Sequence, residues 1–174
     1  MKIITGKARV NYPNIFTPVK LEEDQEAKYS ITILIPKTDI QTLESINNSI
    51  YKTKLQLFEK YNNIPDNIKT PLKDGDIEKP DNEAYKNHYY INASSKFKPG
   101  IVDKNLNSII NPSEIYAGCY IRASLNVYPY YNQDICGVGC SINNIQKISD
   151  GEIINTKPRP EDDFSVIDIE DLLQ

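Results

Sequence analysis

The stretch that most constrains the fold runs from residue 118 to residue 130 and reads GCYIRASLNVYPY. Its apolar and polar side chains alternate with a period of two, which is typical of a strand with one buried face. The side predicted to be buried carries Ile121, Ala123, Leu125 and Val127. The opposite side carries Tyr120, Arg122, Ser124, Asn126, Tyr128 and Tyr130. A chain built around this strand must pair it in a sheet and cover its apolar side.

The polar side of this strand sets one basic residue among aromatic rings. Such a surface suits a nucleic-acid strand, because tyrosine stacks on bases of any sequence and arginine binds phosphate. Tyrosine is also a good strand former on a solvated face, which is an equally simple explanation. This strand alone leaves both interpretations open.

Four further strands and one helix are predicted from the same kind of pattern. Alternation predicts strands over 2–12, 28–36, 88–97 and 136–148. Two prolines place residues 12–20 in a turn or at a sheet edge. A helix is predicted to start after Thr38 or Asp39 and to run to Tyr61. The polar segment 62–87 is predicted to be a long surface insertion, either a binding loop or partly mobile.

These elements do not alternate between strand and helix, which argues against a parallel sheet. The predicted class is all-β dominated, with one inserted helix. An OB-fold, a five-stranded antiparallel barrel, fits the strand count, and OB-folds bind single strands or oligosaccharides. Gly137 and Gly139 lie on the open side of the last strand, where they would permit close approach of a ligand backbone.

The charge is unevenly distributed along the chain. The net charge is −4, but residues 161–174 contain six carboxylates and no basic residue, so residues 1–160 carry +2. The preceding sequence NTKPRP has two prolines and reads as the end of the folded part. We therefore expect an OB-fold domain over 1–156 and a flexible acidic tail over 157–174.

Several other classes are not favoured by the sequence. No apolar run approaches 18 residues and MKIITGKARV lacks a signal-peptide core, so we expect a cytoplasmic protein without a membrane segment. Cys136 and Cys140 lie four apart in a predicted strand, roughly 13 Å at ~3.3 Å per residue. That separation is too long for one disulfide or one zinc ion, so we expect buried free thiols.

Candidate catalytic residues are few. Glu26-x-Lys28 resembles the end of a nuclease motif but lies in an acidic loop. Asp74-Gly75-Asp76 could hold a cation, although Asp-Gly pairs usually mark turns. His88 has no recognisable catalytic partner and is expected to be a strand residue. With no Walker loop and no nucleophile elbow, we expect neither an enzyme nor a cofactor or metal site.

Several ordered segments resemble one known family. They are GKARVNYPNIFTP, KYSITILIPKTD, PLKDGD with IEKPDNEAYKNHYYINASSKFKPGIVD, IYAGCYIRASLNVYPY, and GVGCSINNIQKISDGE. Together they resemble the phage single-stranded DNA-binding proteins, formerly a domain of unknown function, over about residues 6–164. The resemblance implies an OB-fold replication and recombination protein with an acidic tail. The chain ends in Leu172-Leu173-Gln174 instead of a terminal aromatic residue or Pro-Phe.

The predicted DNA-binding site combines basic and aromatic residues from the predicted strands and their flanks. It comprises Lys7, Arg9, Tyr12, Phe16, Tyr90, Lys96, Lys98, Tyr120, Arg122, Tyr128 and Tyr130. Some of these aromatic residues are expected to belong to the core. The predicted partner-binding residues of the tail are Asp162, Asp163, Phe164, Asp168, Asp171 and Leu172.

The expected partners are single-stranded DNA and, through the tail, replication or recombination proteins, with the chain a monomer or homodimer. Two alternatives remain open. One is a structural or protein-interaction phage component that uses the tyrosine-rich face. The other is an OB-type nuclease or its accessory subunit.

Overall fold

The computed structural model describes residues 1–154 except 21, 63, 66, 133 and 134, and it is mostly β with one main helix. The six residues predicted to form the tail site lie outside the described residues, as does the predicted boundary at 156. In chain order the elements are β1 (Lys2–Ile4), β2 (Ala8–Val19), β3 (Lys28–Pro36), α1 (Ile40–Lys60), β4 (Leu72–Asp74), α2 (Gly75–Glu78), the 3₁₀ turn η1 (Glu83–Tyr85), β5 (His88–Ser95), β6 (Gly100–Val102), the 3₁₀ turn η2 (Pro112–Glu114), β7 (Tyr120–Asn132) and β8 (Ile135–Ser149).

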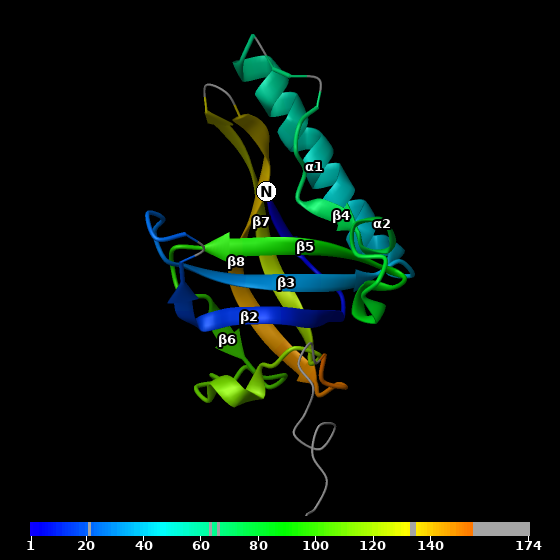
Figure 1. The fold of residues 1–174 in the computed structure, drawn as a ribbon, viewed down its shortest axis with the longest axis vertical. Coiled ribbons are helices and arrows are strands. Elements are labelled where there is room, and N and C mark those ends of the chain that lie inside the picture. The colour runs from blue at the N-terminus through cyan, green and yellow to red at the C-terminus, as the bar shows by residue number, and fades with distance from the viewer. Residues whose placement is uncertain (21, 63, 66, 133–134, 155–174) are drawn as a thin grey trace, which may run out of the picture.

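The strands form one sheet that is folded into two layers. Their order is β4-β5-β3-β2-β7-β8-β6, and β1 pairs with β7 beside this path. Figure 1 shows β2, β3 and β5 running across the front, while β7 and β8 cross behind them at a steep angle. The β7–β8 hairpin extends beyond the front layer, and α1 leans along it (Figure 1). The core therefore lies between the two crossed layers.

The alternation predicted for the central strand is confirmed. Ile121, Ala123 and Leu125 are fully buried, and Val127 is 1 % exposed. The front layer supplies the facing side chains, because Ile33 of β3 pairs with both Val10 of β2 and Ile91 of β5. At roughly 25 cal/mol per Å² of buried apolar surface, this contact between layers is the main stabilising term.

Eight strands are described where five were predicted, and no pairing among the described residues closes the sheet into a barrel. The predicted strand 2–12 was wrong in its bounds, since it divides into β1 and the start of β2. The prolines also do not end β2, which continues to Val19. A shift in register between Asn11 and Asn14 absorbs the irregularity, so Val10 and Ile15 are both buried although five residues apart.

The helix α1 begins where the capping pattern predicted. Asp39 is the N-cap, and its carboxylate accepts a hydrogen bond from the Thr42 backbone N–H at 3.2 Å. The inner side chains, such as Ile46 and Leu57, pack against the core. The helical spacing of apolar residues also predicts Ile40 and Phe58 on this inner side, but they are 58 % and 54 % exposed.

The segment 62–87 contains β4, α2 and η1, so it is more ordered than a surface loop. Asp74 caps α2, and the carboxylates of Asp74 and Asp76 both pair with the Lys37 ammonium, at 2.7 and 2.8 Å. These contacts raise the pKa of Lys37 and lower that of Asp76. The Asp-Gly-Asp sequence is therefore a helix start held by a lysine.

The described residues can also be searched for metal sites, membrane-spanning helices and disulfides. No group of three or more His, Cys, Asp or Glu residues in the described part of the chain could hold a metal ion. Within the same residues, no helix has both the length and the apolar character to span a bilayer. His88 begins β5, as expected. Cys119, Cys136 and Cys140 are buried free thiols, which confirms the interpretation for the pair in β8.

Candidate nucleic-acid interface

The outer face of β2, β3 and β5 carries rows of uncharged hydrogen-bonding side chains. Thr32 is paired with Asn11 on one side and Asn92 on the other, and its hydroxyl donates to the Asn92 amide oxygen at 2.7 Å. In the next row Ser30 is paired with Asn14 and Ser94. Directly paired residues lie on the same side of a sheet. These six residues, together with Tyr12, are called the front face below. Asn11 and Thr32 are buried within it, so Asn14, Ser30, Asn92 and Ser94 are its solvent-accessible polar side chains.

A covered apolar row borders the front face at one end. Leu34 of β3 is paired with Arg9 and Tyr90, and Tyr90 is paired with Lys73 of β4. Tyr85 of η1 packs its ring edge-on against Tyr90, with ring centres 5.1 Å apart. The Asn11 amide donates to the Tyr85 hydroxyl at 3.1 Å, and this hydrogen bond links the Tyr85–Tyr90 pair to the polar rows.

Tyr12 projects from the front face through an unusual backbone conformation. Its φ of 45° lies in the left-handed region, which non-glycine residues rarely adopt. The Tyr12 N–H donates to the Asn11 side-chain oxygen at 3.0 Å, so the buried Asn11 stabilises the bulge. The result is a tyrosine that is 54 % exposed in the middle of a polar surface. Backbone strain of this kind, of order 1–3 kcal/mol, concentrates at functional sites.

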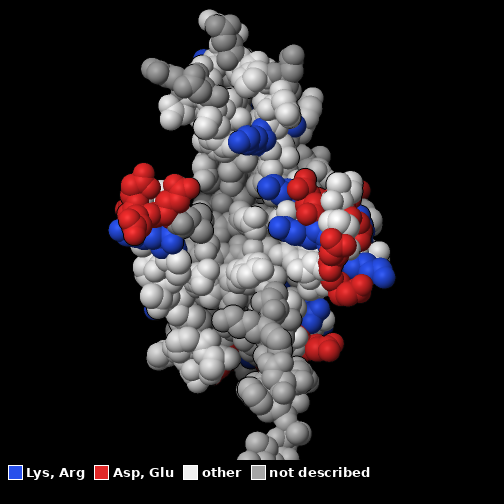
Figure 2. Space-filling view, viewed as in Figure 1, with Lys and Arg blue, Asp and Glu red and all other residues white. Residues whose placement is uncertain are grey.

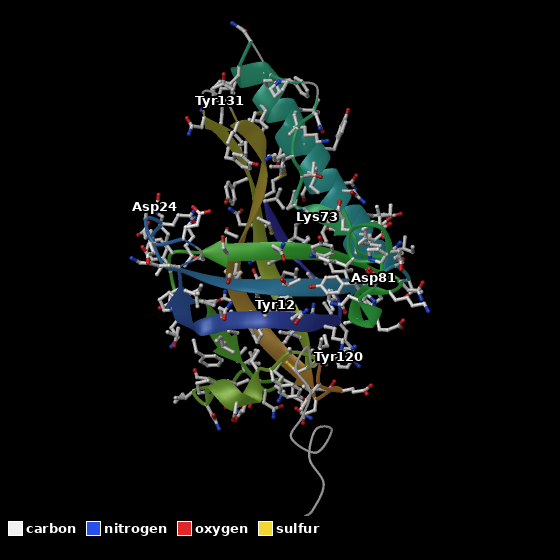
Figure 3. The ribbon with its side chains drawn as sticks, in the orientation of Figure 1. Tyr12, Asp24, Lys73, Asp81, Tyr120 and Tyr131 are labelled. Carbon is white, nitrogen blue, oxygen red and sulfur yellow. The ribbon has the colours of Figure 1, made fainter. Side chains whose placement is uncertain are left out.

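Charged residues surround the front face on two sides. In Figure 2 the blue and red side chains gather on the two flanks, and uncharged atoms lie between them. Figure 3 places Asp24 on one flank, Asp81 on the other and Tyr12 between them. Both flanks mix lysines with carboxylates, so the charged residues do not form a uniform basic patch.

A groove of about 590 Å³ runs along β4, which is paired with β5, to the β7–β8 hairpin. Its lining includes Lys69, Lys73 and Tyr130, together with the carboxylates of Asp74 and Glu78. Lys73 is also the cross-strand partner of Tyr90. A larger cleft of about 800 Å³ lies between residues 78–84 and 152–154. Four carboxylates line that cleft against Arg9 and Lys79, so it suits a polyanion poorly.

The structure distributes the predicted basic residues over several surfaces. Arg9 borders the front face, but its guanidinium donates to the carbonyls of Gly118 and Glu152. Lys7 lies 4.4 Å from the centre of the Tyr120 ring, next to the C-terminal end of the described chain. These two cations therefore also have structural contacts within the protein.

Two other predicted cations lie at the far end of the front layer. Lys96 pairs with Glu26 at 2.7 Å, and this contact lowers the pKa of Glu26. Glu26 of the Glu26-x-Lys28 sequence therefore belongs to an exposed ion pair with Lys96. Lys98 lies 5.8 Å from the ring centre of Phe16, which is itself partly packed against the core.

The predicted aromatic residues divide into exposed and engaged rings. The assignment of Tyr90 as a stacking residue was wrong for this structure, because Tyr90 is 4 % exposed and its burial raises the pKa of its hydroxyl. Tyr128 and Tyr130 lie over Gly139 and Gly137, their cross-strand partners, where any Cβ would collide with the rings. The two glycines therefore accommodate tyrosine rings and not the backbone of a ligand.

Arg122 lies away from the front face. It is exposed on the outer side of β7, and its Nε donates to the Thr5 carbonyl oxygen at 3.3 Å. The outer side of β7 and the front face point in opposite directions, because the apolar sides of both layers share the core. The predicted residues thus do not form one continuous surface.

Sequence reasoning missed the polar rows of the front face and the two lysines of the groove. The missing signal was present in the alternation of 28–36 and 88–97, where Ser30, Thr32, Asn92 and Ser94 oppose the apolar side. The sequence of each strand does not show which strand lies beside it, so these residues could not be recognised as one surface.

Comparisons with known proteins agree with this architecture. The family model described as Enterobacter phage Enc34, ssDNA-binding protein, matches residues 1–173. Protein p50 of Acyrthosiphon pisum secondary endosymbiont phage 1 is 30% identical over 185 residues, covering 99% of both chains.

Two solved structures have the same fold. The single-stranded DNA-binding protein of bacteriophage Enc34, in complex with ssDNA, superposes with a TM-score of 0.78 at 24% identity, over 88% of this chain and 89% of that one. The single-stranded DNA-binding protein gp2.5 of bacteriophage T7 gives 0.68 at 12% identity, over 95% of each chain. The chain belongs to the Enc34 ssDNA-binding protein family.

Proposed function

We propose that this protein binds single-stranded DNA, without strong sequence preference, across the front face and the groove along β4. The observation that carries the proposal is Tyr12, an exposed ring held by a strained bulge above uncharged hydrogen-bonding rows. Aromatic rings stack on any base, and hydroxyl and amide groups bind base edges and sugar oxygens. Family membership supports the same class of ligand.

The arrangement of the strands supports an OB-type path for the DNA. We take β2, β3, β5, β7 and β8 as the five strands of an OB barrel, with β1, β4 and β6 as additions. In OB-folds the ligand lies over strands two and three and contacts the loops between strands one and two and between strands four and five. In this protein those positions correspond to the front face, the β2–β3 connection and the β7–β8 hairpin.

In this proposal the cations and the aromatic residues have separate roles. Lys73 and Lys69 bind phosphates in the groove beside Tyr130, Lys98 binds them near Phe16, and Tyr12 stacks on a base. The acidic residues 161–174 recruit replication or recombination proteins through their mixture of carboxylates and apolar side chains. No step of this function requires catalysis by the protein.

The proposal is tested by titrating a fluorescent oligo-dT and a matched duplex at two salt concentrations. For single strands, log K falls with log salt at about −0.7 per neutralised phosphate, so three to five contacts give a slope near −2 to −3.5. We expect tight binding of oligo-dT with such a slope and weaker binding of the duplex. A flat salt response, or equal affinity for the duplex, would contradict the proposal.

A further inference from the structure

A separate hollow of about 210 Å³ lies on the outer side of β7 and β8. Four polar side chains surround it in register, since Arg122 is paired with Gln146 and Ser124 with Asn144. β1 and β6 flank these strands, and Ile4 of β1 is paired with Ser124. The hollow is therefore built by four strands of the sheet, together with the loop after β6 that carries Leu106.

Two exposed apolar side chains contribute to the walls of the hollow. Ile4 is 55 % exposed and Leu106 is 72 % exposed, although both line the same small space. Leu106 has a φ of 66°, and the loop that carries it is fixed by Asp103, whose carboxylate accepts from the N–H groups of Asn105 and Asn107 at 2.8 and 2.9 Å. An exposed leucine held in the left-handed region is costly for folding alone.

The polar groups of the hollow have unused hydrogen-bonding capacity. The Ser124 hydroxyl is buried, and it has no hydrogen-bond partner among the described residues. The Gln146 amide makes a long hydrogen bond of 3.5 Å to the Asp103 carbonyl, and Asn144 is exposed. The Arg122 guanidinium is oriented by the Thr5 carbonyl. An apolar space with a few convergent polar groups is typical of a small-molecule site.

We propose that this hollow is a second nucleotide site, which binds one unstacked nucleobase. A base has two apolar faces and a polar edge, which match the aliphatic walls formed by Ile4 and Leu106 and the amides of Asn144 and Gln146. Arg122 then binds the adjacent phosphate. This inference extends the proposed function, because the hollow lies on the side opposite the front face and a bound strand would have to pass around the sheet to reach it.

Two variants remove the apolar walls without touching the core. Leu106→Asn keeps a residue type that tolerates positive φ, and Ile4→Thr keeps a β-branched residue at an exposed strand position. Leu55→Asn on α1 is the matched control, since Leu55 is also an exposed leucine. The probes are deoxyadenosine monophosphate, deoxyribose 5-phosphate and a dA oligonucleotide, because the base could come from a free nucleotide or from a strand.

The readout is the NMR signals of the Asn144 and Gln146 side-chain amides. We expect the monophosphate and the oligonucleotide to shift these signals saturably, and each wall variant to raise the Kd of the monophosphate at least fivefold while Leu55→Asn does not. Unmoved amide signals would overturn the inference, as would equal shifts with the base-free sugar phosphate. If deleting residues 161–174 moves the signals in the DNA-free protein, the occupant is that segment and the inference also fails.

The two proposals fail in different ways. If oligonucleotides bind but the Asn144 and Gln146 signals do not move, the second site is refuted and the front face stands. If no oligonucleotide binds, the proposed function fails. The monophosphate titration then still tests whether the hollow binds a base.

Discussion

Tyr12→Gly separates binding from stability more sharply than any other change in this protein. A tyrosine with φ of 45° is strained, whereas glycine adopts that conformation without a steric penalty. Relief of left-handed strain is worth roughly 1–2 kcal/mol, and the additional unfolded-state entropy of glycine costs about 0.5–1 kcal/mol. The ring is 54 % exposed, so its removal sacrifices little packing. We therefore expect an unchanged or slightly raised melting temperature.

The affinity for single-stranded DNA should fall in the same variant. Loss of one base–aromatic stack costs about 1–3 kcal/mol, which corresponds to a 5- to 150-fold weaker Kd. Tyr12→Phe keeps the ring and should bind within about threefold of the wild type, because the hydroxyl is not needed for stacking.

The assay is fluorescence anisotropy with oligo-dT, combined with thermal unfolding of each variant. Tyr51→Ala is the matched control, since Tyr51 is a 63 % exposed tyrosine on α1. If Tyr12→Gly binds as tightly as the wild type, Tyr12 does not stack on a base. If it melts much lower, the strain argument is wrong.

Further outcomes follow from the core, the helix cap, the thiols and the acidic segment. Leu125→Ala truncates a fully buried side chain and should lower the free energy of unfolding by about 2–5 kcal/mol, whereas Arg122→Ala should lower it far less; chemical denaturation that shows equal losses would reverse the two sides of β7. Asp39→Ala removes the N-cap of α1 and should cost about 0.5–2 kcal/mol in the same experiment, and no loss would mean that the cap is not stabilising. Burial raises the pKa of Cys140 to about 12, so its thiolate is scarce at pH 8 and a thiol reagent should label it only after unfolding; rapid labelling of the native protein would refute its burial. Deleting residues 161–174 changes the net charge from −4 to +2 and should tighten binding to single strands, mainly at low salt, and equal affinities there would show that the segment does not compete with DNA.

The sequence predicted the fold well where a strand has one apolar side. The alternation around Leu125 is a direct consequence of the pleat, and the start of α1 follows from the capping chemistry of Asp39. The short strands β4 and β6 were missed because each has only three residues, too few for a periodic pattern, and β1 was merged with the start of β2. The continuation of β2 through Pro13 and Pro18 depends on a bulge that local rules do not predict.

The candidate site was predicted less completely, because a site depends on which strands are neighbours. Tyr12 and Tyr90 were both predicted to stack on bases, and Tyr12 is exposed, but Tyr90 is buried beneath Tyr85. That contact comes from η1, which lies in a segment predicted to be a surface insertion. Arg122 has the charge expected of a phosphate ligand, yet its strand belongs to the layer that faces away from Tyr12.

Amide mapping by NMR locates the bound DNA strand on the protein surface. The protein is titrated with a short oligo-dT, and the backbone and side-chain amide signals are followed residue by residue. We expect saturable shifts at Tyr12, Ser30, Asn92 and Lys73, with Tyr51 and Leu55 of α1 unmoved. Saturable binding whose shifts spare the front face and fall on α1 would contradict this expectation.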